Sequence, residues 1–213
     1  MFEHPIVMLD FETTGLSPAM GDRVTEVAAL RIVDGRVTER YVSLINCQVR
    51  IPSFISQLTG ITQAMVDSAP PVHRVLPELL DFIGADTLSA HNASFDEKFL
   101  KAEAERLGKA TSHCALVCSL KLSRRVFPGM PSYKLGLLSG QLGIRFRSAA
   151  HRAESDAEVA AAVLLHIGQH IGRTYGLGKV KPQLLVSVNK LSAAKVPQFL
   201  QKYSSENIVS KLA

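Results

Sequence analysis

Apolar and polar residues alternate in a way that divides the chain into strand-like segments first and helix-like segments later. Residues 5–12, 23–33 and 36–45 are short apolar runs rich in β-branched residues, which is typical of strands. Asp34 and Gly35 separate the second run from the third, and Asp-Gly is a strong signal for a tight hairpin. The pattern therefore predicts three antiparallel strands at the start of the fold.

Helical spacing of apolar residues dominates the rest of the chain. It predicts helices over residues 75–84, 94–108, 120–126, 134–142 and 153–173, with short strands at 87–91 and 114–119. A right-handed crossover would make these two strands parallel. Ser94 and Glu97 fit a capping box, which would place Asp96 second in its helix. The whole order predicts an α/β fold with a mixed sheet flanked by helices.

Composition limits the class of protein. The chain has 213 residues, 46% of them hydrophobic, which suits one globular domain with a sizeable core. Apolar runs stay well short of the roughly 20 residues of a membrane span, and the acidic Glu3 near the N-terminus is unlike a secretory leader. The expected location is the cytoplasm. Cys47, Cys114 and Cys118 lack paired spacing, which argues against a disulfide framework or a structural zinc site.

Charge is distributed unevenly along the chain. Residues 1–175 carry 18 Lys and Arg and 18 Asp and Glu, whereas residues 176–213 carry six lysines and a single acid, Glu206. We therefore predict a main domain at 1–175 and a basic C-terminal extension at 176–213. The extension could attract phosphates, bind a protein partner such as a polymerase, pack on the domain, or simply aid solubility.

Two acids end the first predicted strand. Asp10 and Glu12 lie two residues apart and therefore share one face of the strand. Like charges at the end of a buried strand repel, and relief requires a proton, a cationic side chain or a metal ion. Taken alone, the pair is better explained by exposure to water at the rim of the sheet.

Two further acids lie on apolar helix stripes. Asp96 shares a stripe with Phe99 and Leu100, and Asp156 shares one with Val159 and Val163. Core-facing stripes would bring both acids towards the sheet that carries Asp10 and Glu12. His151 precedes Asp156 by five residues, and an imidazole there could accept a proton near neutral pH.

Three motifs, DFETTG, HNASFD and HRAESD, resemble in this order the DEDDh family of 3′-5′ exonucleases, which is typified by the proofreading epsilon subunit of bacterial DNA polymerase III. The resemblance covers residues 6–171 and implies a ribonuclease H-like fold. It also implies that His151 is the general base and that a metal is bound by Asp10, Glu12, Asp96 and Asp156. Thr59 departs from the family, because the epsilon subunit has His there.

The resemblance implies a substrate-binding segment as well. Thr13, Thr14, Gly15 and Leu16 would contact the terminal nucleotide through backbone amides and the Leu16 side chain. An ordinary turn after a strand would explain Gly15 equally well. Phe95 could stack on a base or pack in the core.

These residues predict a metal-dependent hydrolase. Two Mg²⁺ ions, for which Mn²⁺ could substitute, suit carboxylate ligands and phosphodiester hydrolysis. The expected partner is a nucleic acid with a free 3′ end, single-stranded where it is cut, and the expected products are nucleoside 5′-monophosphates. Three functions remain open: a DNA exonuclease that acts alone or with a polymerase, an exoribonuclease, and a non-catalytic binding module.

Overall fold

The computed structural model describes residues 1–145 and 151–212, with side chains as far as Glu206. Ala213, the last residue of the predicted extension, lies outside the described residues. No helix within these ranges combines the length and apolar character needed to cross a membrane.

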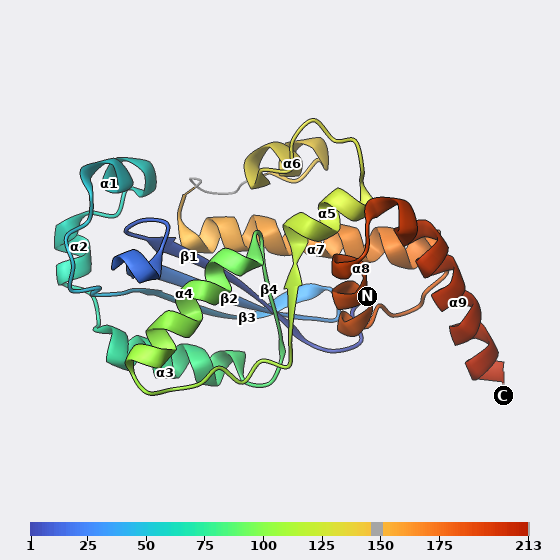
Figure 1. Ribbon diagram of the computed structural model, residues 1–213, viewed down its shortest axis with the longest axis horizontal. Coiled ribbons are helices and arrows are strands. Elements are labelled where there is room, and N and C mark those ends of the chain that lie inside the picture. The colour runs from blue at the N-terminus through green and yellow to red at the C-terminus, as the bar shows by residue number, and fades with distance from the viewer. Residues whose placement is uncertain (146–150, 213) are drawn as a thin grey trace.

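A mixed sheet of five strands, in the order β3-β2-β1-β4-β5, forms the centre of the protein (Figure 1). β1 (Ile6–Thr13), β2 (Val24–Val33) and β3 (Arg36–Leu44) are antiparallel, whereas β4 (Thr87–Ala90) and β5 (Ala115–Cys118) run parallel to β1. Asp34 and Gly35 both have positive φ, as a two-residue type I′ hairpin requires. The predicted strands, their directions and the hairpin are confirmed.

Helices cover both faces of the sheet, and short ones lie at its end. The predicted helices correspond to α3 (Val72–Ile83), α4 (Ala93–Arg106), α5 (Ser119–Val126), α6 (Leu135–Gln141) and α7 (Ala153–Thr174). Further helical segments were not predicted because they are short or polar. They are α1 (Ser53–Thr59), α2 (Gln63–Asp67), α8 (Pro182–Lys190) and the 3₁₀ turns η1 (Pro18–Met20) and η2 (Ala193–Lys195).

The predicted capping box of α4 is wrong. The helix begins at Ala93, one residue before Ser94, and the capping position belongs to Asn92 with φ 79°. Only His91 and Asn92 separate β4 from α4, so the chain must turn sharply, and Asn tolerates the left-handed conformation. Asp96 is therefore the fourth residue of the helix, not the second.

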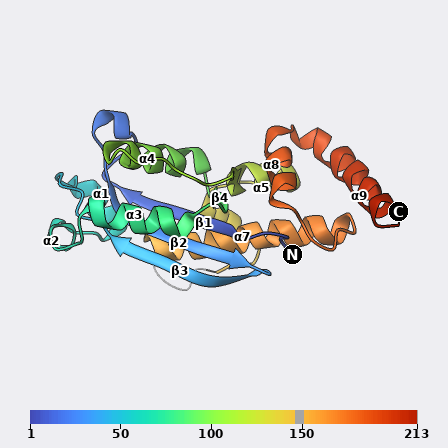
Figure 2. The same ribbon diagram turned by 90° about the horizontal axis from the view of Figure 1, so that it is seen from below.

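Alternation along β1 divides its side chains between two cores. Ile6 and Met8 pack in one core with residues of α7, whereas Val7 and Leu9 pack in the other with residues of α3 and α4. Figure 2 shows the sheet between these helix layers. Asp10 and Glu12 continue the even-numbered series, so they lie on the α7 side of the sheet.

The C-terminal segment packs against the domain. Leu184 and Leu185 of α8 and Leu200 of α9 (Val196–Leu212) are buried in the same core as α7. The side chain of Asn189 accepts a hydrogen bond from the Cys118 backbone N–H at 2.7 Å and donates one to the Cys118 carbonyl at 3.1 Å. One residue on β5, the edge strand, is thus paired by a side chain. The division of the chain into a domain and a separate extension stays a prediction.

Candidate active site

Three carboxylates from two elements meet at one point. Asp10 and Glu12 project from β1, and Asp156 projects from the first turn of α7. One ligand oxygen from each lies within 4.8 Å of the others. The parity of β1 and the stripe on α7 explain this meeting, because both face the space between the helix and the sheet.

Asp96 approaches the same region but does not belong to this close group. Its side chain is 3% exposed, and Oδ1 accepts a hydrogen bond from the Phe11 backbone N–H at 3.2 Å. Phe11 lies between Asp10 and Glu12 on β1. The hydrogen bond therefore attaches the start of α4 to the strand that carries the other two acids.

Burial raises the pKa of the acids in this group. For Asp10, burial is the largest cause, followed by the charges of Asp96, Asp156 and Glu12. Burial and then Asp156 raise the pKa of Glu12 to about 8. Burial also raises the pKa of Asp96, to about 8, with a smaller effect from Glu12. Without a cation, the four acids cannot all be ionised at low cost.

The donor set fits a divalent metal ion. Oδ1 of Asp156 is buried and has no hydrogen-bond partner among the described residues, so one lone-pair donor is free to take a ligand. Carboxylate oxygens are the ligands that Mg²⁺ and Mn²⁺ prefer. A bound cation would also remove the repulsion that raises these pKa values.

His151 lies two residues before the start of α7, with an exposed side chain and a left-handed backbone of φ 62°. Burial raises the pKa of Asp156, whereas the charge and backbone hydrogen bond of His151 lower it. The imidazole is therefore beside the acids and open to solvent, as a group that exchanges protons must be.

Glu26 and Arg152 were not predicted, yet they hold the site together. Glu26 lies opposite Glu12 in the ladder between β1 and β2 and is 3% exposed. Its carboxylate accepts hydrogen bonds from Arg152 Nε at 3.0 Å and from the Ala153 backbone N–H at 2.9 Å. The start of α7 is thereby attached to β2. The available signal was an acid within the buried strand sequence VTEVAAL.

The segment after β1 presents Leu16 to solvent, with 79% of the residue exposed. Thr14 is buried, its N–H donates to the Arg23 carbonyl, and its hydroxyl accepts from the Arg23 N–H at 3.0 Å. A Cβ on Gly15 would collide with the Asp22 carboxylate. Any larger residue would have to displace this carboxylate, which accepts a hydrogen bond from the Ser17 N–H at 2.9 Å, so packing within the loop itself favours glycine whether or not a nucleotide binds there.

Two charged side chains of α4 hold this loop in place. Glu103 is buried and pairs with Arg23 through two hydrogen bonds of 2.8 and 2.9 Å. Lys98 Nζ donates to the Leu16 carbonyl at 2.8 Å. The loop that carries Thr13 to Leu16 is therefore fixed to the helix that carries Asp96.

Two positions point inward: Phe95, which was predicted to contact substrate, and Thr59, where the epsilon subunit has His. Phe95 is half-buried and packs at 5.0 Å between ring centroids against Phe99, so part of its ring belongs to the core. Thr59 is buried, and its hydroxyl donates to the Ile55 carbonyl at 2.9 Å and accepts from the Ile61 N–H. Thr59 is thus the last residue of α1, and this position presents no imidazole to solvent.

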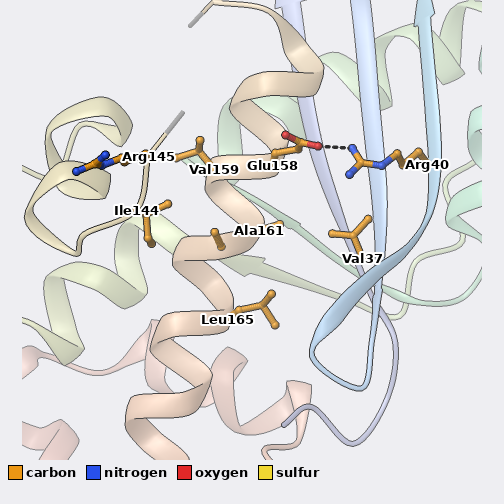
Figure 3. Close-up of a pocket in the computed structure, with 9 residues that line it drawn as sticks. Val37, Arg40, Ile144, Arg145, Glu158, Val159, Ala161 and Leu165 are labelled. Carbon is orange, nitrogen blue, oxygen red and sulfur yellow. Dashed lines mark ion pairs between the residues drawn. The ribbon is translucent and has the colours of Figure 1, made fainter. Parts of the chain in front are cut away.

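A hollow of about 400 Å³ lies elsewhere, between β3 and α7 (Figure 3). Val37, Ile144 and Leu165 form apolar parts of its wall, and Arg40 at its edge pairs with Glu158 at 2.6 Å. None of the four acids Asp10, Glu12, Asp96 and Asp156 lines it. The chemistry is therefore assigned from the acids and not from the hollow.

Comparison with known sequences identifies the family. The sequence model described as Exonuclease matches residues 7–164. The DNA polymerase III subunit epsilon of Aquifex aeolicus is 34% identical over 179 residues, covering 84% of this chain and 87% of that protein. The 3′-5′ exonuclease DinG of Bacillus subtilis is 41% identical over 167 residues, covering 78% of this chain. This chain spans only 18% of DinG, and 11% of a PolC-type DNA polymerase III from Clostridium perfringens.

Solved structures agree on the fold. Exonuclease X, solved in complex with 5′ overhanging duplex DNA, has a TM-score of 0.68 and 24% identity, and the match covers 86% of this chain and 99% of that one. The nuclease domain of 3′hExo, a DEDDh family member bound to rAMP, has a TM-score of 0.66 and 21% identity, with coverage of 78% and 92%. The predicted membership of an exonuclease family is confirmed. The protein belongs to the exonuclease family and has its ribonuclease H-like fold.

Proposed function

We propose that the protein is a metal-dependent 3′-5′ exonuclease that removes nucleoside 5′-monophosphates from the 3′ end of DNA. The observation that carries this proposal is the convergence of Asp10, Glu12 and Asp156 to within 4.8 Å on a fold of the exonuclease family. Buried acids without a cationic partner of their own are costly, and such a group persists where it binds a cation.

Asp10, Glu12, Asp96 and Asp156 would hold Mg²⁺, as two ions, with Mn²⁺ as a substitute. When bound, the ions supply a low-pKa water and stabilise negative charge on the scissile phosphate. Asp10 and Glu12 fix the position of the ligand set because they belong to a buried strand. Asp96 contributes from the opposite side through α4, where its hydrogen bond to Phe11 already orients its carboxylate.

His151 would accept the proton from the attacking water. Its imidazole is exposed, and the next residue along the chain, Arg152, donates a hydrogen bond to Glu26. Thr13, Thr14, Gly15 and Leu16 would receive the terminal nucleotide, with the Leu16 side chain against the base. Half-buried Phe95 would contribute at most one edge of its ring.

DNA is favoured over RNA by the relatives named DNA polymerase III, of which two are 35% and 34% identical to this chain. The RNA alternative is supported by 3′hExo, a neighbour bound to rAMP, at 21% identity. The polymerase III relatives also favour a cytoplasmic role beside a polymerase, with the C-terminal helices as the contact.

The test is a degradation assay on 5′-labelled single-stranded DNA, duplex DNA and RNA of matched sequence, each with Mg²⁺, Mn²⁺ or EDTA. We expect a metal-dependent ladder of shortened 5′-labelled products, strongest on single-stranded DNA. Asp156→Asn keeps the side-chain shape but removes a charged ligand, and should lower the rate about a hundredfold or more. Asp67→Asn, on the surface helix α2, is the matched control.

A ladder on RNA alone would replace the DNA proposal with the exoribonuclease. Absence of any metal-dependent ladder with wild-type protein would support the non-catalytic module instead. Equal rates of degradation in wild type and Asp156→Asn would show that this group of acids does not carry the activity.

A further inference from the structure

Basic and acidic residues are separated along the chain more strongly than the division into residues 1–175 and 176–213 suggests. Residues 106–153 contain nine Lys and Arg and no Asp or Glu. Residues 1–105 contain eight Lys and Arg and fifteen Asp and Glu. Residues 106–153 include β5, α5 and α6.

Helix α5 displays three of these cations together. Lys121, Arg124 and Arg125 are three and four residues apart, so they share one face of the helix. Lys121 and Arg124 are exposed, whereas Leu122 and Ser123 between them are buried. The helix thus turns its cations outwards and packs its other side on the core.

The same surface continues onto the C-terminal segment. α5 packs against α8 and η2, as Figures 1 and 2 both show for α8. Arg125 Nε donates to the Leu191 carbonyl at 2.7 Å, which fixes the connection between these elements. Lys190 and Lys195, both exposed, flank Leu191. We call Lys121, Arg124, Arg125, Lys190 and Lys195 the basic face.

The basic face adjoins the edge of the sheet that carries the acids. Arg124 lies over the Tyr133 ring at 5.8 Å, and the Tyr133 carbonyl is 2.9 Å from His91 Nε2. His91 Nδ1 lies 2.9 Å from the hydroxyl of Ser119, the first residue of α5. His91 directly follows β4 and stands five residues before Asp96, so these contacts join α5 to the start of the helix that carries a catalytic acid.

Three exposed cations of the basic face have no counter-charge close by in the described part of the chain. In the described part of the chain, Lys121, Arg124 and Lys195 have no carboxylate within 4.0 Å. By contrast, Arg40 and Arg152 are both paired with glutamates. A cluster of exposed cations that lacks counter-charges within the protein raises the local concentration of polyanions.

We propose that the basic face binds the phosphate backbone of the single strand whose 3′ end occupies the active site. The proposal rests on the proposed function, and it assigns the nucleotides upstream of the cut to α5 and the α8-η2 connection. A row of cations that follows a backbone binds it without regard to sequence. Base contacts are left to the active site.

The test compares the triple variant Lys121→Ala, Arg124→Ala, Lys195→Ala with a control triple, Arg36→Ala, Lys109→Ala, Lys179→Ala. The control removes the same charge from exposed lysines and an arginine outside the basic face. Binding of a fluorescent 20-nucleotide single strand is followed by anisotropy in EDTA at several salt concentrations. We expect the first triple to weaken binding about tenfold and to lower the salt slope by up to about 2, with little change in the control.

Turnover gives a second readout. The ratio of kcat/KM on a 20-nucleotide strand to that on a trinucleotide should fall about tenfold in the first triple and stay constant in the control. Equal binding and equal ratios in the two triples, or no binding of the strand by wild type, would overturn the proposal. If the first triple binds poorly but wild type degrades no DNA with metal, the binding surface stands and the nuclease assignment fails.

Discussion

The protonation of Glu12 and Asp96 links the site to the stability of the fold. Burial, with neighbouring acids, raises the pKa of each carboxyl group to about 8. In the unfolded chain such groups titrate near pH 4. Between about pH 4 and pH 8 the folded protein therefore holds more protons than the unfolded one, and its stability falls as pH rises.

We expect the Tm of the protein in EDTA to decrease from pH 5 to pH 8, as measured by calorimetry. Glu12→Gln removes one of the responsible groups and should flatten this dependence, whereas Glu105→Gln, on the exposed side of α4, should not. Mg²⁺ or Mn²⁺ should raise the Tm more at pH 8 than at pH 5, because ionised carboxylates bind cations. A Tm equally dependent on pH in wild type and Glu12→Gln would contradict the assignment.

Two elements meet through Glu26, which connects β2 to the first turn of α7. The backbone of α7 begins with unpaired N–H groups, and the Glu26 carboxylate accepts from the Ala153 N–H at 2.9 Å. The same carboxylate holds Arg152, whose charge in turn lowers the pKa of Glu12. Glu26 thereby sets the position of His151 and Asp156 relative to β1 without belonging to the close group of acids.

Glu26→Gln should therefore lower kcat about tenfold or more while KM for DNA changes little, since only positioning of the reactive groups is affected. The concentration of Mn²⁺ needed for half-maximal activity should rise, which a general loss of stability would not produce. Glu39→Gln on β3, an exposed acid that also pairs with an arginine, is the control. Unchanged kcat and metal dependence in Glu26→Gln would show that the contact is only structural.

Sequence reasoning succeeded where periodicity was long and failed where contacts were distant. Strands and long helices have apolar repeats that a linear reading detects, and the parity of β1 gave the shared face of Asp10 and Glu12. Helices α1 and α2 have only seven and five residues, too few for a repeat. The start of α4 depends on a tight turn after β4, and Glu26 meets Arg152 across 126 residues. A linear reading of the sequence detects neither this turn nor the contact between Glu26 and Arg152.

At the scale of the whole molecule, equal numbers of basic and acidic residues in 1–175 hide the separation of an acidic segment from a basic one. The 18 basic and 18 acidic residues of 1–175 cancel, so these counts assign the excess of positive charge to the extension alone. The fold places β5 and α5 next to α8, and α5 also next to η2, which joins basic residues of two segments into one surface. A boundary drawn after Glu105 would have revealed the division, but its position depends on how the chain folds.

Asn189 provides a test of how firmly the C-terminal helices belong to the fold. Asn189→Ala removes both hydrogen bonds to Cys118 on β5. The free energy of unfolding should fall by about 2 kcal/mol, which corresponds to a Tm lower by about 5 °C. Gln183→Ala, exposed on the same helix, is the control for changes on α8. Equal Tm values in the two variants would mean that these hydrogen bonds add nothing to stability.

Helix α7 has 22 residues and extends about 33 Å, from Asp156 in its first turn to the segment that leads into α8. The length of the helix therefore separates the candidate active site from the C-terminal helices. A protein that bound α9 would lie at the opposite end of this helix from the acids (Figure 1). A partner protein bound to α9 would then not obstruct hydrolysis of a strand at the acids, nor would the strand obstruct the partner.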